Sequence, residues 1–263
     1  MSRRPSPPIR AAVPALVVLL ALPVAAVAQQ RHEGVARTPD GTAVAYRESH
    51  WIYRDGTAPA RLVLYRCPGG AAFARKTVRE GADPTAPDFD FIDARTGYRE
   101  GVRTRGAERE VFWQESAASR MATRRIQLGK GTVVDAGFDA WVRSRWAGLA
   151  GGAGQVAPFL VPSRLRAYDV RVAPAGETVE AGRPVRRLRM RLAAWFGFAL
   201  PDVVLTYDAR DRRLLRYEGL GVVRDAKGRP MPVRIDFPSA PVPAGRGEID
   251  AAARQALVTR CAA

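Results

Sequence analysis

From residue 33 onward, the chain consists of short segments in which apolar and polar residues alternate, separated by turn-forming residues. Alternation with a period of two is typical of strands that bury one face. The first four segments are residues 33–37, 42–53, 61–66 and 73–78, and the turns between them contain Pro39-Asp40-Gly41, Asp55-Gly56 and Pro68-Gly69-Gly70. Because these connections are short, we expect neighbouring strands to pair as antiparallel hairpins.

The same pattern continues through the rest of the chain, which lacks the regular alternation of strands and helices found in parallel sheets. Further strands are predicted at residues 89–93, 98–104, 109–114, 120–128, 166–172, 185–195, 203–207, 214–218, 220–223 and 233–237. We therefore expect a mainly β fold, in which an antiparallel meander forms a curved half-barrel or barrel.

Two helices are predicted beside these strands. Within residues 135–149, apolar side chains recur at spacings of three to four, which indicates an internal amphipathic helix capped by Asp135. A short C-terminal helix is predicted at residues 248–260. The chain then divides into a signal peptide at residues 1–28, a single β-rich half-barrel domain at 29–238, and a Pro/Gly linker with the C-terminal helix at 239–263.

Residues 1–28 have the features of a secretory signal peptide: arginines at positions 3, 4 and 10 precede an apolar run that ends in Ala26-Val27-Ala28. We expect cleavage after Ala28 and a periplasmic or secreted product with no integral membrane span. Two alternatives remain open. One is an uncleaved N-terminal anchor, because eighteen uncharged residues nearly span a bilayer, although Pro14 and Pro23 disfavour that. The other is twin-arginine export through Arg3-Arg4.

The chain is strongly basic, with 42 Lys and Arg against 26 Asp and Glu. Removing the three arginines of residues 1–28 leaves a balance of +13. Such a charge attracts nucleic acid, anionic lipid or acidic polysaccharide, and export argues against nucleic acid. The remaining explanations are a solvated arginine-rich surface and a dedicated anion site. The expected partners are therefore a lipid or another amphiphile, or an anionic component of the cell envelope.

Cys67 and Cys261 are the two cysteines of the chain, and an oxidising compartment permits them to form a disulfide. They lie near opposite ends of the mature chain, and the sequence gives no distance between them, so their pairing stays open at this stage. No Cys-x-x-Cys motif occurs, which disfavours thiol redox catalysis and a cysteine zinc site.

A search for reaction motifs gives mainly negative results. With two histidines, His32 and His50, the chain cannot build a histidine-rich metal site, and Ser49-His50 cannot form a triad because adjacent strand residues point to opposite faces. No nucleophile elbow or dinucleotide fingerprint is present. We therefore expect no catalytic residue, no metal and no cofactor. Carboxylates that a glycosidase would need are plentiful, but no spacing selects a pair; the candidates are Glu48, Asp93, Glu100 and Glu115.

Several segments resemble those of an uncharacterised group of exported proteobacterial proteins, over most of residues 33–238. They are Tyr46-Arg47-Glu48-Ser49-His50-Trp51, Leu64-Tyr65-Arg66-Cys67-Pro68, Val134-Asp135-Ala136-Gly137-Phe138-Asp139, Leu205-Thr206-Tyr207-Asp208 and Val233-Arg234-Ile235-Asp236-Phe237-Pro238. That resemblance implies no function. The strand, helix and strand layout is loosely similar to the half-barrel superfamily of the periplasmic lipoprotein carrier and its outer-membrane receptor, which implies a fold and the handling of lipid.

Two features suggest a binding site. Arg187, Arg189 and Arg191 alternate with apolar residues on one predicted strand and can hold phosphate or carboxylate groups. The helix face with Phe138, Trp141 and Trp146 can line an apolar cavity. Together they fit an apolar or anionic amphiphilic ligand, although a solvated strand face and a core helix explain each feature separately.

The leading hypothesis is therefore an exported, non-enzymatic binder or carrier of such a ligand. The alternatives are an exported hydrolase that acts on envelope polymers, and a structural envelope protein with a basic binding face.

Overall fold

The computed structural model describes residues 29–193 and 202–262 and confirms the predicted mainly β fold. The predicted signal peptide and the end of the strand predicted at 185–195 lie outside the described residues. The strands are β1 (Gln30–Arg37), β2 (Val44–Asp55), β3 (Ala58–Arg66), β4 (Ala72–Arg79), β5 (Asp88–Asp93), β6 (Tyr98–Arg105), β7 (Glu108–Gln114), β8 (Ala122–Ile126), β9 (Val133–Val134), β10 (Gln155–Val161), β11 (Arg166–Glu180), β12 (Arg183–Leu192), β13 (Val203–Asp208), β14 (Leu214–Arg224), β15 (Pro230–Asp236) and β16 (Val242–Pro243). The helices are α1 (Gly137–Ser144), the short 3-10 turn η1 (Pro162–Arg164) and α2 (Arg246–Arg254).

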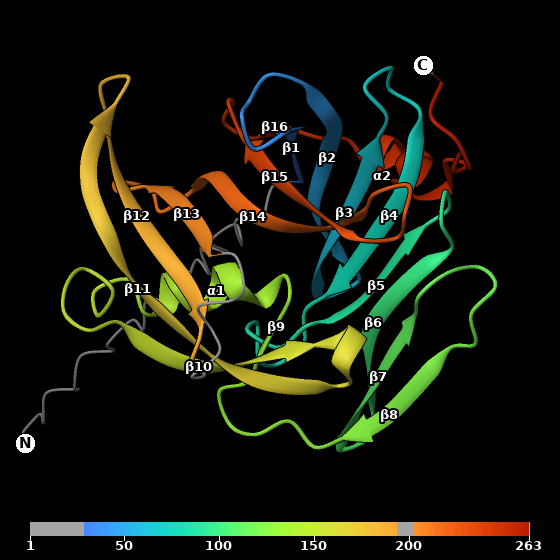
Figure 1. The fold of residues 1–263 in the computed structure, drawn as a ribbon, viewed down its shortest axis with the longest axis horizontal. Coiled ribbons are helices and arrows are strands. Elements are labelled where there is room, and N and C mark those ends of the chain that lie inside the picture. Colours follow the sequence, from blue (N-terminus) through green and yellow to red (C-terminus); the bar gives the residue numbers. More distant parts are fainter. Residues whose placement is uncertain (1–28, 194–201, 263) are drawn as a thin grey trace, which may run out of the picture.

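These strands form one curved sheet whose order is β8 to β1, followed by β15 down to β9, while β16 pairs with β1. Almost all neighbours are antiparallel, as the short turns predict, and the β9 pairing with β10 is parallel. The pairing of β1 with β15 joins the two halves of the chain. At the far end, η1 contacts β6 and β7, so the sheet curls back on itself around α1 (Figure 1).

Strand β10 is the main element that the sequence pattern does not reveal. It follows a glycine-rich stretch and contains Pro158, and both features favour a loop. It is nevertheless a strand because β11 pairs with it along its full length, from Gln155 opposite Val172 to Val161 opposite Arg166. The strands predicted at 214–218 and 220–223 form the single strand β14, with a register irregularity after Leu220.

The internal helix is present but shorter than expected, and its start differs from the prediction. Turns continue from Arg145 to Leu149, so Trp146 and Leu149 are buried outside the regular helix. The N-cap residue is Ala136, and no side chain caps the helix. The prediction that Asp135 caps it is therefore wrong. The Asp135 backbone has a left-handed φ of 38°, and its carboxylate binds Lys76 instead.

The second helix, α2, packs against the outer face of the sheet. Ile249 and Ala252 are buried with Trp51, Leu62 and Leu64 of β2 and β3. The chain after α2 crosses β4, where the Val258 amide donates to the Ala72 carbonyl, and ends in a disulfide between Cys261 and Cys67. The disulfide that the sequence left open is thus formed. Among the described residues, no helix is long and apolar enough to cross a membrane.

Candidate functional site

The curved sheet and α1 line an open cavity of about 560 Å³, a volume typical of small-molecule sites. Its walls come from both halves of the sheet, because β2, β3, β4 and β6 face β10 and β12 to β15 across it. Alternation sends every second residue of each strand to this inner face. The site is therefore built from residues that lie far apart in the sequence.

One side of the cavity is mainly apolar, although Asp139, Arg191 and Arg224 also line it. It is formed by α1 and by strands of the C-terminal half, and its residues include Phe138, Phe159, Leu160, Met190, Val203 and Leu205. The Phe138 ring stacks on Trp141 with a centroid distance of 5.8 Å and meets Phe159 edge to face at 6.1 Å. These contacts give the apolar wall a fixed shape.

The other side of the cavity carries ionisable groups, which the strand register aligns. One row across the inner face of β1 to β6 contains His32, His50, Val63, Lys76, Phe91 and Glu100. The adjacent row contains Gly34, Glu48, Tyr65, Ala74, Asp93 and Tyr98. An apolar cavity with a few convergent polar groups is the usual form of a ligand site.

Two of these polar groups, Lys76 and Glu100, each have a hydrogen-bond partner in the cavity wall. The Lys76 ammonium donates to both carboxylate oxygens of Asp135, at 3.0 and 2.8 Å. The Tyr98 hydroxyl donates to Glu100 at 2.6 Å. Burial, together with the charge of Asp135, raises the pKa of Glu100, while the Tyr98 hydrogen bond lowers it. Glu100 therefore holds a proton more readily than an exposed glutamate.

The two histidines of the chain meet at the β1 side of this wall. Their rings stack with centroids 4.6 Å apart, and the Phe237 ring packs edge-on against both. His50 Nε2 lies 2.7 Å from a carboxylate oxygen of Glu48. Burial, followed by the positive charges of His50, Arg61 and Arg213, lowers the pKa of His32 to about 3. His32 is therefore neutral at physiological pH.

The residues predicted on the helix face have different environments. Phe138 lines the cavity. Trp141 and Trp146 are buried in the core between α1 and the sheet, together with Val142, Leu149 and Val172. The three aromatic residues thus support the apolar wall, but Phe138 is the one of the three that lines the cavity.

The three predicted arginines lie in a row on β12, and acidic neighbours of the same chain bind each of them. Arg187 pairs with Glu180, while Arg189 and Arg191 share Asp202 at 3.6 and 2.7 Å. Of the three, Arg191 lines the cavity. The structure brings Phe138 and Arg191 to one cavity, and it places Arg187 and Arg189 outside its lining.

The cavity also contains residues that the sequence-based site prediction omits. Glu48 and Glu100 come from the four candidate carboxylates; Asp93 is instead fully buried and binds Arg95, and Glu115 is exposed. Lys76 and Arg61 are new. A signal for Lys76 exists in the sequence, because it occupies an inward position of β4 between Ala74 and Val78. This position predicts that Lys76 lines the cavity only when the register of the strands is known.

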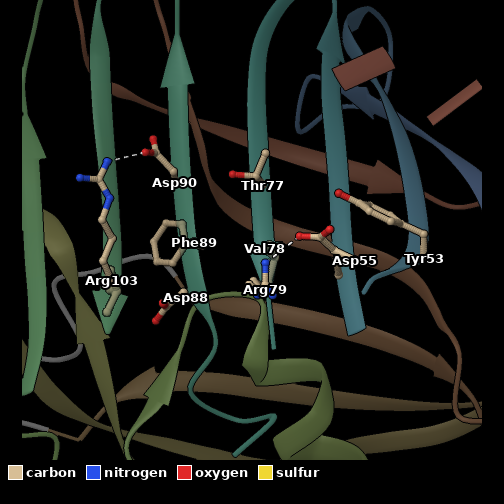
Figure 2. A pocket seen from close by; sticks show the side chains of 11 residues that line it. Tyr53, Asp55, Thr77, Val78, Arg79, Asp88, Phe89, Asp90 and Arg103 are labelled. Atoms are coloured by element: carbon tan, nitrogen blue, oxygen red, sulfur yellow. Dashed lines mark hydrogen bonds and ion pairs between the residues drawn. The ribbon is translucent and has the colours of Figure 1, made fainter. Parts of the chain in front are cut away.

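A second hollow, of about 320 Å³, lies at the ends of β2 to β6 and is shown in Figure 2. Its charged residues are paired: Asp55 binds Arg79 and Asp90 binds Arg103 within the hollow, and Asp90 and Asp88 also bind Arg99 and Arg109 beside it. In the part of the chain that the structure describes, no group of three or more His, Cys, Asp or Glu residues is arranged to hold a metal ion.

No family model and no curated protein sequence matches the chain. Three solved structures align with most of the chain. A β-barrel-like protein of a domain of unknown function, DUF1849, from Brucella abortus has 10% identity and a TM-score of 0.46, over 82% of this chain and 100% of that one. A DUF1329 family protein from Desulfovibrio piger has 12% identity and a TM-score of 0.26, over 77% and 68%.

The third structure is a putative outer membrane lipoprotein-sorting protein domain from Vibrio parahaemolyticus. It has 10% identity and a TM-score of 0.29, over 86% of this chain and 89% of that domain. All three TM-scores lie below 0.5, so these similarities carry no argument about fold or function.

Proposed function

We propose that this protein is a periplasmic, non-catalytic carrier that binds the apolar part of an amphiphilic ligand in the cavity between the two halves of the sheet. The observation that carries the proposal is the cavity itself. It measures about 560 Å³, its wall of α1 and β10 to β14 is mainly apolar, and the opposite wall carries Glu48, His50, Arg61, Lys76 and Glu100. Such a division of polarity fits a ligand with an apolar tail and a polar head.

The most direct test is native mass spectrometry and lipid extraction of the protein purified from the periplasm. We expect a bound amphiphile that leaves when the protein is denatured. Protein that carries no ligand, and that binds neither lipid nor an apolar fluorescent probe, contradicts the proposal.

A matched pair of variants tests where the ligand binds. Val203 is partly buried and lines the cavity, whereas Val179 is 65% exposed on β11 and lies outside the cavity lining. Val203→Trp fills part of the cavity, so we expect at least tenfold weaker binding of the neutral probe N-phenyl-1-naphthylamine. Val179→Trp adds the same side chain to the surface and should leave the probe affinity unchanged. Equal affinities for both variants contradict binding in this cavity.

A second candidate function, hydrolysis of an envelope polymer, is favoured by Glu100. A general acid must hold a proton near neutral pH, and burial raises the pKa of this carboxyl. Asp135 lies near enough for its charge to add to that effect, but it is bound to Lys76. If this function is correct, the wild type releases soluble fragments from purified peptidoglycan and Glu100→Gln does not. No release by the wild type contradicts it for that polymer.

A further inference from the structure

The cations that line the cavity differ in whether they already have a partner. Lys76 donates to both oxygens of Asp135, and Arg191 forms two hydrogen bonds with Asp202. The Arg224 guanidinium stacks over the Tyr98 ring at 4.0 Å. Lys76 and Arg191 are therefore bound by carboxylates. Arg224 is covered by the Tyr98 ring, but its Nε is buried without a hydrogen-bond partner among the described residues.

Arg61 differs from Lys76 and Arg191 in lacking a hydrogen-bonded carboxylate, and it differs from Arg224 in that no aromatic ring covers its guanidinium among the described contacts. Its closest carboxylate oxygen belongs to Glu80 and lies 3.9 Å away, beyond hydrogen-bond distance. Its Nε is buried and has no hydrogen-bond partner among the described residues. A buried donor without a partner destabilises the folded state, because it has lost its hydrogen bonds to water. A ligand group that accepts hydrogen bonds from the guanidinium would remove that cost.

The surroundings of Arg61 are electropositive. Arg61 pairs with Ile52 across β2 and β3, and His50 pairs with Val63, so Arg61 and His50 are diagonal neighbours on the inner face. The stacked His32 has a buried Nδ1 that also has no partner in the described chain. The charges of Arg61, Arg213 and His50 all oppose protonation of His32. The carboxylates on this side are Glu48, which is bound to His50, and Glu80.

We propose that the anionic head group of the amphiphile, a carboxylate or a phosphate, binds to the Arg61 guanidinium beside His50, while the tail extends toward Phe138 and Met190. This inference rests on the proposed function and adds the chemical class of the head group. Guanidinium is suited to this role because its planar N–H groups bind carboxylate and phosphate oxygens in pairs. The +13 balance of the mature chain would also attract such a ligand.

Four ligands with the same dodecyl tail test the head group: dodecanoate, dodecyl phosphate, dodecanol and dodecylammonium, each measured by isothermal titration calorimetry. We expect the two anions to bind at least tenfold more tightly than the alcohol and the ammonium. The ratio between the two anions identifies the better head group. Equal affinity for all four ligands overturns the head-group assignment but leaves the carrier function standing, whereas no binding of any of them contradicts the carrier function itself.

The variant Arg61→Ala locates the anion site. It should weaken the better-bound anion by about ten- to hundredfold, the usual effect of losing hydrogen bonds to a charged group. It should leave dodecanol binding unchanged, which also shows that the cavity is still folded. Arg61→Lys keeps the charge and should recover part of the affinity.

The matched control is Arg125→Ala, which removes an exposed arginine on β8 that lies outside the cavity lining. We expect this variant to bind all four ligands like the wild type. An equal loss for the anion and for dodecanol in Arg61→Ala, or an equal loss of anion affinity in Arg61→Ala and Arg125→Ala, overturns the assignment.

Discussion

Charged side chains on the inner face of this sheet are compatible with folding because nearby side chains of the same protein pair with them. A buried lone charge is strongly unfavourable, whereas a paired and hydrogen-bonded charge is tolerated. Lys76 with Asp135 and Glu48 with His50 follow this rule. Arg61 departs from this rule, because no carboxylate among the described residues is hydrogen-bonded to it. This departure is the reason for proposing that a ligand group binds there.

The depressed pKa of His32 predicts a loss of stability in acid. The unfolded value is 6.5 and the folded value is about 3, so the unfolded chain binds the proton more tightly. Stability is therefore complete above pH 6.5 and falls as the pH decreases toward 3. We expect this residue to lower the free energy of unfolding by about 2 kcal/mol between pH 7 and pH 5.

Urea unfolding of the wild type and of His32→Gln at both pH values checks this prediction. The variant has no titratable group at position 32, so its stability should fall by about 2 kcal/mol less than that of the wild type over this interval. The comparison uses the difference between the two pH values, which removes any constant effect of the substitution. Parallel pH dependence of the two proteins would contradict the prediction.

At the scale of elements, strands β5, β6 and β7 are packed so closely that a side chain in place of one of their glycines is costly. A Cβ at Gly101 on β6 would lie 2.3 Å from the Phe89 carbonyl oxygen and 2.3 Å from the Phe112 ring. Gly101→Ala should therefore lower the free energy of unfolding by about 2–3 kcal/mol. Gly81→Ala is the matched control, because nothing lies within 4 Å of its added methyl, and its stability should stay within about 0.5 kcal/mol of the wild type.

Chemical denaturation of both glycine variants measures the two values. A Gly101→Ala protein as stable as Gly81→Ala would show that β5, β6 and β7 can separate at low cost, and it would contradict the close packing of Phe112 over β6.

The C-terminal segment is held on the sheet by three kinds of contact. Ile249 of α2 is buried, the Trp51 indole donates to Glu248 at 2.8 Å, and Cys261 is bonded to Cys67. The disulfide joins residues 194 positions apart. In the loop-entropy description, a cross-link over that distance raises the free energy of the unfolded chain by about 5 kcal/mol.

The double variant Cys67→Ser with Cys261→Ser should therefore be less stable than the oxidised wild type by about 2–5 kcal/mol. Urea unfolding of the variant, the oxidised wild type and the reduced wild type measures this difference. The reduced wild type serves as the control, because it lacks the cross-link and keeps both sulfur atoms. A loss below 1 kcal/mol in both would show that the contacts of α2 hold the segment without the cross-link.

At the scale of the whole molecule, local patterns predict the strands better than they predict the site. Alternation and turn residues suffice for β1 to β8 because each hairpin is a local structure. The β1 to β15 pairing and the contact of η1 with β6 and β7 depend on closure of the complete sheet. The cavity exists through that closure. For this reason the sequence pattern indicates Phe138 as a lining residue, whereas Arg61 and Lys76 are recognised as lining residues only from the strand register.

A cavity that spans both halves of the sheet predicts that a ligand stabilises the whole fold. Binding to the native state alone at one hundred times the dissociation constant adds about 2.7 kcal/mol. For a chain of this size, that corresponds to a rise in melting temperature of about 5–10 °C. Differential scanning calorimetry with dodecanoate should show this rise for the wild type and for Val179→Trp, but not for Val203→Trp, whose cavity is partly filled. A ligand-induced rise of equal size in Val203→Trp would place the ligand elsewhere on the molecule.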